Sequence, residues 1–409
     1  MREEAGGAVL RLVHSADWHL GRAYQQFPRP LQLRLQTDLE GRLEQLLQRG
    51  RGAVQRLYLL LGDIFDSWSA GERAEQVFRQ FLEDAGGPVV YCCGNHDPFE
   101  PGQAALASHP QLIVLATEPE IILFPKWRLL LAGRSLAPNK IHSPLRLARL
   151  EELWSQGRLR VWDPGRGLRA WQEGDPGLEL SRSYYRLYLH HGTVSSSVGG
   201  AYSPLQIGAR AFLDWDRLVL GHVHESCQFT REGLDLAYSG CLQGAGFDEL
   251  GPCSYFWADL LEGQLLGRWQ RSALRGLQFR RLDLCWEGDP GFRSLREEII
   301  KSLASDLSEQ ILDLRLRRPG GLSLVQQTEL EQVLAGLGLA SWKLSLSSDG
   351  GREGAVDIRE TGAPGLDTFL GKTQELSPEG RRLLQLLATA READSDLLWR
   401  LLEEAGPCT

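Results

Sequence analysis

Short hydrophobic runs that are typical of buried β-strands recur along the first 260 residues of the chain. Five of these runs end directly in a polar motif that is rich in histidine or aspartate. Amphipathic segments with leucines at helical spacing separate the first runs, so strand and helix alternate there. Because crossover helices join parallel strands, this rhythm predicts an α/β fold. The five runs span residues 9–13, 57–61, 89–93, 187–189 and 218–220.

Closely spaced apolar runs replace this rhythm after residue 97. The runs at 113–115, 121–124 and 127–131 predict antiparallel strands, and those between 227 and 269 predict an antiparallel meander. The stretch 138–183 is rich in Pro, Gly and Trp and predicts a partly helical insertion. We therefore expect a pair of mixed sheets that is covered by helices.

The composition changes again near Leu274, where a smaller α/β pattern begins. We place the first domain at 1–272 and a small α/β domain at 273–350. Several glycines mark 351–376 as a flexible linker. The tail at 377–409 predicts two amphipathic helices, with a start signal at Ser377 and Pro378.

Bulk composition excludes several classes of protein. Of the 409 residues, 42% are hydrophobic and 24% are charged, as in ordinary globular proteins. No apolar run is long enough to cross a membrane, and the N-terminus lacks the layout of a signal peptide. The seven cysteines form no CxxC pair, which argues against structural zinc and a disulfide framework. A reducing cytoplasm is the expected location.

The charge of the chain is unevenly distributed. The net charge of −8 argues weakly against a nucleic-acid partner. However, the stretch from Lys126 to Arg169 holds ten Lys and Arg residues against three Asp and Glu residues. Nearly all the positive charge is arginine, which suits bidentate contact with phosphate. The stretch predicts either a DNA-binding surface or an ordinary solvated surface.

The polar motifs at the strand ends carry ligand types that suit a transition metal. Asp17 and His19 alternate by two, so their side chains leave an extended segment on one side. A carboxylate together with an imidazole suits Mn, Fe or Zn better than Mg or Ca. Asp63 follows a glycine at the next strand end, where a carboxylate can bridge two ions. His222 and His224 repeat the alternation, and Gly221 permits close backbone approach.

Each motif alone also occurs in proteins without a metal. An isolated Asp-x-His pair is common, and Gly-Asp after a strand is usually a turn. The joint occurrence of five such motifs, each at a strand end, predicts a two-metal hydrolytic centre.

The order of these motifs, D-x-H, G-D-x-x-D, G-N-H-D, H and G-H-x-H, resembles that of the calcineurin-like metallophosphoesterases. More narrowly, residues 13–21, 62–66 and 238–249 are similar to the SbcD-type DNA-repair nucleases. Residues 189–192 and 243–244 are similar to their YhaO-like branch. The resemblance covers about residues 8–262. It implies a sandwich of α/β/β/α layers with a small C-terminal α/β capping domain and a helical tail.

The resemblance implies a role for each motif residue. Two divalent ions, expected to be Mn²⁺, would share Asp63. His96 would not bind metal but would protonate the leaving 3′ oxygen or steady the transition state, with Asp97 orienting it. Asp66 is expected either to contact a ligand side chain without binding metal itself or to form the turn of its own motif. The implied metal ligands are Asp17, His19, Asp63, Asn95, His191, His222 and His224.

His190 and His191 stand where the family has a single histidine. Adjacent strand residues face opposite ways, so only one of the two reaches the metals. Residues 191–194 fit the family phrase His-x-x-Val, so we expect His191 to be the ligand and keep His190 as the alternative.

The leading hypothesis is the nuclease component of a DNA double-strand-break repair complex. Such a component acts as a Mn²⁺-dependent exonuclease on duplex ends and as an endonuclease on single strands. Its partner would be an SMC-like coiled-coil ATPase that docks on the helices after Ser377, and a homodimer is compatible with the resemblance. The alternatives are a phosphoesterase acting on a small phosphodiester or a phosphoprotein, and a DNA-end-binding scaffold.

Overall fold

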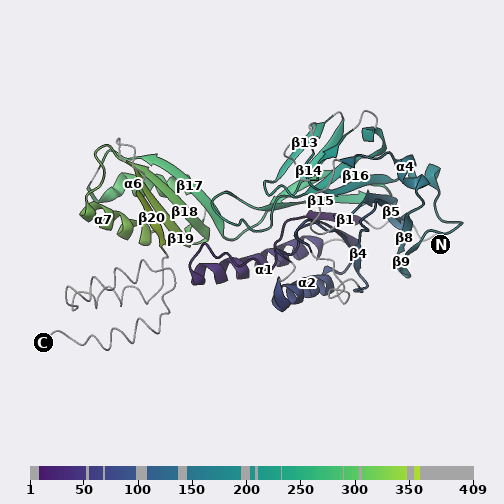
Figure 1. The fold of residues 1–409 in the computed structure, drawn as a ribbon, viewed down its shortest axis with the longest axis horizontal. Coiled ribbons are helices and arrows are strands. Elements are labelled where there is room, and N and C mark those ends of the chain that lie inside the picture. The colour runs from purple at the N-terminus through teal and green to yellow at the C-terminus, as the bar shows by residue number, and fades with distance from the viewer. Residues whose placement is uncertain are drawn as a thin grey trace, which may run out of the picture. The chain divides into compact units, whose positions relative to one another are not determined.

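The computed structural model describes most of the chain up to residue 359. The described residues are 9–51, 55–67, 70–97, 108–136, 145–194, 203–207, 211–231, 233–288, 290–303, 306–347 and 354–359. Two large sheets and one four-stranded sheet organise this part of the chain (Figure 1). Within the described part, no helix is both long and apolar enough to cross a membrane.

Six strands form the first large sheet, in the order β16-β15-β1-β2-β3-β4. Strands β1 to β4 are parallel, and β15 pairs antiparallel with both β1 and β16. The antiparallel orientation that we predicted for the run at 113–115 is therefore wrong, because β4 runs parallel to β3. The strands are β1 (Leu10–Ser15), β2 (Gln55–Leu61), β3 (Val89–Cys92), β4 (Leu112–Val114), β15 (Ser254–Leu261) and β16 (Gln264–Ala273).

Eight strands form the second large sheet, in the order β13-β14-β12-β10-β6-β5-β8-β9. The predicted insertion contributes β8 and β9 to the edge of this sheet in addition to short helices. The strands are β5 (Glu120–Phe124), β6 (Leu129–Gly133), β8 (Leu159–Asp163), β9 (Gly167–Ala170), β10 (Tyr185–His191), β12 (Arg217–Gly221), β13 (Cys227–Arg231) and β14 (Leu234–Tyr238). A separate two-stranded sheet consists of β7 (Leu145–Arg146) and β11 (Leu205–Gln206).

The two large sheets pack face to face, and helices cover their outer faces. One buried cluster joins leucines of β1 and β2 to leucines of β6 and β10. Helices α1 (Arg29–Arg51) and α2 (Gly71–Ala85) lie on the first sheet, and α4 (Leu150–Ser155) and α5 (Leu178–Ser181) pack against the second. This confirms the predicted α/β/β/α layers.

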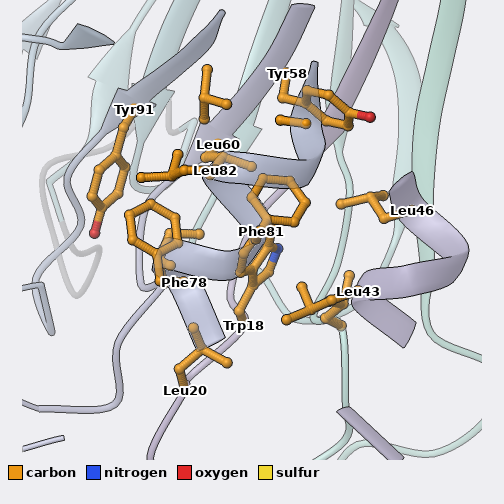
Figure 2. Packing of buried hydrophobic residues seen from close by; sticks show 14 of the residues in the cluster. Trp18, Leu20, Leu43, Leu46, Tyr58, Leu60, Phe78, Phe81, Leu82 and Tyr91 are labelled. Carbon is orange, nitrogen blue, oxygen red and sulfur yellow. The ribbon is translucent and has the colours of Figure 1, made fainter. Parts of the chain in front are cut away.

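Trp18 anchors the first polar motif to the core. Its side chain is fully buried, and its ring packs edge-on against Phe81 of α2, with centroids 4.9 Å apart (Figure 2). The indole nitrogen donates to the Oγ of Ser15 at 2.8 Å. Burial of Trp18 thus fixes the backbone between Asp17 and His19 against the core.

Residues after Leu274 form a four-stranded sheet in the order β17-β18-β19-β20, with its own buried cluster. Strand β20 includes residues 354–359, which we predicted to be part of a linker. The alternation of Val356 and Ile358 with polar residues explains the strand. The predicted tail at 377–409 lies outside the described residues. The elements are β17 (Gln278–Cys285), α6 (Arg293–Leu303), β18 (Gln310–Arg317), α7 (Leu324–Ala335), β19 (Ser341–Ser347) and β20 (Gly354–Arg359).

Candidate metal centre

The polar motifs after β1, β2, β3, β10 and β12 come together between the two large sheets. The backbone N–H of Asp17 donates to the carbonyl of Gly62 at 2.9 Å within the first sheet. The N–H of His222 donates to the carboxylate of Asp17 at 3.0 Å and so joins the second sheet to the first. Strand ends of both sheets therefore place their polar side chains in one region.

Four of the predicted ligands have backbone conformations that residues with a side chain seldom adopt. Asp17, His19, Asp63 and His222 have φ values of 53°, 49°, 51° and 95°. Such positive φ values cost about 1–3 kcal/mol each and persist only where the surrounding structure fixes them. Strain that is concentrated on the motif residues supports a functional role for these turns.

Asp17, His19 and His224 form the first group of potential ligands. The Nε2 atoms of His19 and His224 lie 3.3 Å apart, and Oδ1 of Asp17 lies 3.7 Å from Nε2 of His224. Two imidazole nitrogens and a carboxylate oxygen thus converge. This is the donor set that was predicted for one transition-metal ion.

Asp63, His191 and His222 form the second group. Nε2 of His191 lies 3.4 Å from Oδ2 of Asp63 and 3.1 Å from Oδ1 of Asn95. Asp63 also acts on His19 of the first group. Burial lowers the pKa of His19, and the charge of Asp63 opposes that shift. This position fits the bridging role that was predicted for Asp63.

Three glycines make the close approach of these motifs possible. A Cβ atom on Gly62 would lie 2.2 Å from Nδ1 of His191, and one on Gly94 would lie 2.3 Å from Oδ1 of Asp63. A Cβ atom on Gly221 would lie 1.7 Å from the carbonyl oxygen of Leu61. Only glycine fits at these positions, because any side chain would overlap a ligand or its supporting strand.

The two adjacent histidines of β10 face in opposite directions. Nε2 of His190 lies 2.8 Å from the carbonyl oxygen of Ser203, away from both ligand groups. Nδ1 of His191 lies 2.7 Å from the carbonyl oxygen of Leu61, which leaves Nε2 beside Asp63 and Asn95. The structure therefore brings His191, and not His190, to the other predicted ligands.

His96 and Asp97 occupy different environments. The ring of His96 is exposed, and its Nδ1 lies 2.8 Å from the carbonyl oxygen of Asp66. Asp97 is 1% exposed and accepts hydrogen bonds from the N–H groups of Phe65 and Gly94 at 3.0 and 2.7 Å. These contacts join Asp97 to the loop that carries His96 and not to its ring, so the prediction that Asp97 orients His96 stays a prediction. Asp97 ties two motif loops together, and Asp66 holds His96.

Two carboxylates outside the predicted ligand set orient its histidines. Oε1 of Glu249 lies 2.6 Å from Nδ1 of His224, and Oδ1 of Asp66 lies 3.1 Å from Nδ1 of His19. A carboxylate on the far nitrogen fixes the tautomer and orientation of a ligand imidazole. The role expected for Asp66 fits this contact. The sequence did not predict a role for Glu249. Its place at the end of the stretch 238–249, which is similar to the SbcD-type nucleases, could have indicated one.

Burial keeps two of the predicted ligands in a form that suits a cation, whereas at His191 burial is outweighed by the charge and hydrogen bond of Asp63 and the charge of Asp17, which raise the pKa of that ring to about 9. Burial lowers the pKa of His19 and of His222 to about 4, so both rings are neutral at pH 7. Neutral imidazole is the form that binds metals. Burial also raises the pKa of Asp17, and the neighbouring charge of Asp63 adds to this effect. Two carboxylates this close in a buried site repel each other, and a bound cation would relieve that repulsion.

Five arginines of the stretch from Lys126 to Arg169 form ion pairs with carboxylates. Arg149 contacts Asp214 at 3.0 Å, and Arg169 contacts Asp175 at 2.6 Å. Arg146, Arg158 and Arg160 also form ion pairs with glutamates. For these five arginines, the ion pairs favour the ordinary surface over the DNA-binding one.

Known proteins resemble this chain across the region that carries the site. The SbcD component of the nuclease SbcCD from Bacillus subtilis is 29% identical over an alignment of 265 residues that covers 59% of this chain and 64% of that protein. Its counterpart from Escherichia coli K12 is 22% identical over an alignment of 273 residues that covers 60% of this chain and 64% of that protein. The chain thus spans less than two thirds of the length of these relatives.

The chain also matches a solved structure and a protein-family model. A dimetal phosphatase from Danio rerio is 14% identical with a TM-score of 0.42, and the match covers 65% of this chain and 96% of that one. A match this distant adds nothing about the substrate. The family model of calcineurin-like phosphoesterases matches residues 10–226, which include every predicted ligand. Because this match spans more than half of the chain, the chain belongs to the calcineurin-like phosphoesterase family.

Proposed function

We propose that this chain is a two-metal phosphodiesterase that cleaves DNA. The observation that carries the proposal is the convergence of two ligand groups, one around Asp17 and one around Asp63, at the ends of four strands. Their nitrogen and oxygen donors suit two Mn²⁺ ions. When bound, such ions activate the attacking water and stabilise the leaving oxygen of an in-line displacement.

We propose different roles for the side chains of this site: metal binding, orientation of the ligands and proton transfer. The residues that would hold the first ion are Asp17, His19, Asp63 and His224, and those that would hold the second are Asp63, Asn95, His191 and His222. Glu249 and Asp66 hold His224 and His19 in orientation. His96 is exposed beside His19, with ring centroids 5.1 Å apart, and this supports a role for His96 in exchanging a proton with a substrate oxygen.

DNA as the substrate rests on the two relatives, whose names describe nucleases. We propose the same class of substrate here, with exonuclease action on duplex ends and endonuclease action on single strands. Their names also describe one component of a larger nuclease. We accordingly propose an SMC-like ATPase as the partner, docked through residues 377–409.

A direct assay tests the proposed activity. Wild-type protein with Mn²⁺ should release nucleotides from linear duplex DNA, and Asp63→Asn should not. The assay is repeated with the partner ATPase and with a generic phosphodiester reporter. Hydrolysis of the reporter without any cleavage of DNA, even with the partner present, would support the small-phosphodiester alternative. DNA binding without hydrolysis of either substrate would support the scaffold alternative.

A truncation tests the proposed docking segment separately. Deletion of residues 377–409 should abolish association with the ATPase in a pull-down while leaving Mn²⁺ binding unchanged. If the truncated protein still associates with the ATPase, the proposed docking segment is wrong, and the proposed metal centre is not affected by that result.

A further inference from the structure

Two cysteines lie side by side next to the first ligand group. The sulfur atoms of Cys241 and Cys253 are 3.7 Å apart, and Cys253 directly precedes β15. Cys241 is buried, whereas Cys253 is partly exposed. Since sulfur atoms in a disulfide are about 2.0 Å apart, a bond between these two requires an approach of about 1.7 Å.

Cys241 is connected to a predicted metal ligand by two routes. Its backbone N–H donates to the carbonyl oxygen of His224 at 3.0 Å. Its thiol faces Oε2 of Glu249 at 3.7 Å, while Oε1 of the same carboxylate lies 2.6 Å from Nδ1 of His224. A change at the sulfur of Cys241 therefore reaches His224 through Glu249.

The two thiols differ in a way that suits stepwise oxidation. Cys253 is partly exposed and therefore meets an oxidant first. Cys241 is buried, with its sulfur 3.7 Å from that of Cys253. A cavity of about 440 Å³, lined by both cysteines, His224, Glu249 and Arg271, gives a small oxidant access to the pair. Cys253 is thus the attacking thiol and Cys241 the resolving one.

We propose that Cys241 and Cys253 are an oxidisable dithiol whose disulfide form weakens metal binding at His224. The proposal rests on the metal centre of the proposed function. The oxidant is a peroxide. The Cys253 thiolate attacks one oxygen of hydrogen peroxide, the O–O bond breaks, and a sulfenic acid and one water result once the departing hydroxide is protonated. The sulfur of Cys241 then attacks the sulfenic sulfur, the S–S bond forms, and the thiol proton leaves with the hydroxyl group as a second water.

The disulfide would act on the metal site through Glu249. It removes the thiol hydrogen that faces Oε2 and draws the sulfur of Cys241 toward Cys253. Loss of an outer partner of a metal ligand typically weakens metal binding by about 10–100-fold. We expect a loss near the lower end of that range, because Glu249 keeps a second hydrogen bond, from the N–H of Ala245 at 2.8 Å.

Peptide mapping of the full chain tests the disulfide. The parent variant carries Cys285→Ser and Cys408→Ser, because Cys285 is exposed and can cross-link molecules. After hydrogen peroxide in the presence of a chelator, a glutamate-specific protease cuts after Glu249 and separates residues 233–249 from 250–262. We expect the two peptides to stay linked, with the mass of two hydrogens missing, until a reductant releases them. Cys253→Ser should abolish the link, and the matched control Cys227→Ser should retain it.

Calorimetry then tests the coupling between the cysteines and the metal. After removal of peroxide and chelator, the oxidised protein should bind Mn²⁺ about tenfold more weakly than the reduced protein. A reductant should restore the affinity, and peroxide should not change the affinity of Cys253→Ser. Unlinked peptides, or equal affinities of the two forms, would overturn the proposal. If the reduced protein binds no Mn²⁺, the proposed function fails instead, and the metal-free mapping detects the disulfide independently of that result.

Discussion

The Nδ1 atom of His96 lies 2.8 Å from the backbone carbonyl oxygen of Asp66. A carbonyl oxygen only accepts hydrogen bonds, so Nδ1 carries the proton. The exposed ring therefore keeps Nε2 as the atom that can take up a proton and pass it to a substrate oxygen. A main-chain atom of one motif thus sets the chemical role of a side chain in the next motif.

Replacing His96 with Ala should remove proton transfer and leave the metal centre in place. We expect the rate of DNA hydrolysis to fall by about 10²–10⁴-fold. Affinity for Mn²⁺, measured by calorimetry, should stay close to that of the wild type. His109→Ala, a change outside the site, is the matched control and should retain full activity. A large loss of Mn²⁺ affinity in His96→Ala would show instead that His96 binds metal together with His19 and Asp66, with which it forms a third group of potential ligands.

Replacing Asp97 with Ala should destabilise the fold, because its carboxylate accepts two buried N–H groups. Each donor that is left without a partner costs about 1–3 kcal/mol. Denaturant unfolding in the presence of a chelator should therefore show a clear decrease in the free energy of unfolding. If stability is unchanged while activity falls as far as in His96→Ala, Asp97 orients His96 as predicted.

Replacing Gly62 with Ala should damage the second ligand group directly. The added Cβ would lie 2.2 Å from Nδ1 of His191, so the imidazole must move. Gly157 is the matched control, because its φ of 71° is also positive but no atom lies within 4 Å of the added carbon. Gly157→Ala should cost only the backbone strain of about 1–2 kcal/mol. Gly62→Ala should cost more and should also lose Mn²⁺ affinity in calorimetry. Equal effects of the two variants would contradict the close packing at Gly62.

Acid should destabilise the protein partly through His14. Burial, with a further contribution from the charge of Arg217, lowers the pKa of this histidine from 6.5 to about 3. Between these two values the unfolded chain binds a proton that the folded protein does not. The free energy of unfolding therefore falls as the pH drops from 6.5 toward 3, by about 1.4 kcal/mol per pH unit.

The variant His14→Gln keeps a donor for the carbonyl oxygen of Leu220 but cannot titrate. Its stability should decrease less steeply than that of the wild type over the same pH range. Denaturant unfolding at several pH values in a chelating buffer measures both slopes. Identical slopes would exclude His14 as a source of the acid sensitivity.

The strand-end motifs could be predicted because their cause is local. Hydrophobic runs such as 57–61 place the following polar residues at the end of a strand. Asp17 and His19 do lie together, but through backbone conformations with positive φ and not through the alternation of an extended segment. Contacts that depend on the path of a loop could not be predicted. Glu249 contacts His224, which is 25 residues away in sequence. Asp97 accepts hydrogen bonds from the buried N–H groups of Phe65 and Gly94, which have no other signal in the sequence. The ion pairs of the arginine-rich stretch also involve partners, such as Asp214, that are distant in sequence.

The number of Mn²⁺ ions bound per chain tests the central claim most directly. Calorimetry combined with elemental analysis should find two ions on the reduced wild-type protein. Asp63→Asn should bind fewer than two, because the change removes a charged member of the second group and the proposed bridge to the first. Two ions bound with unchanged affinity by Asp63→Asn, or none bound by the wild type, would contradict the two-metal centre.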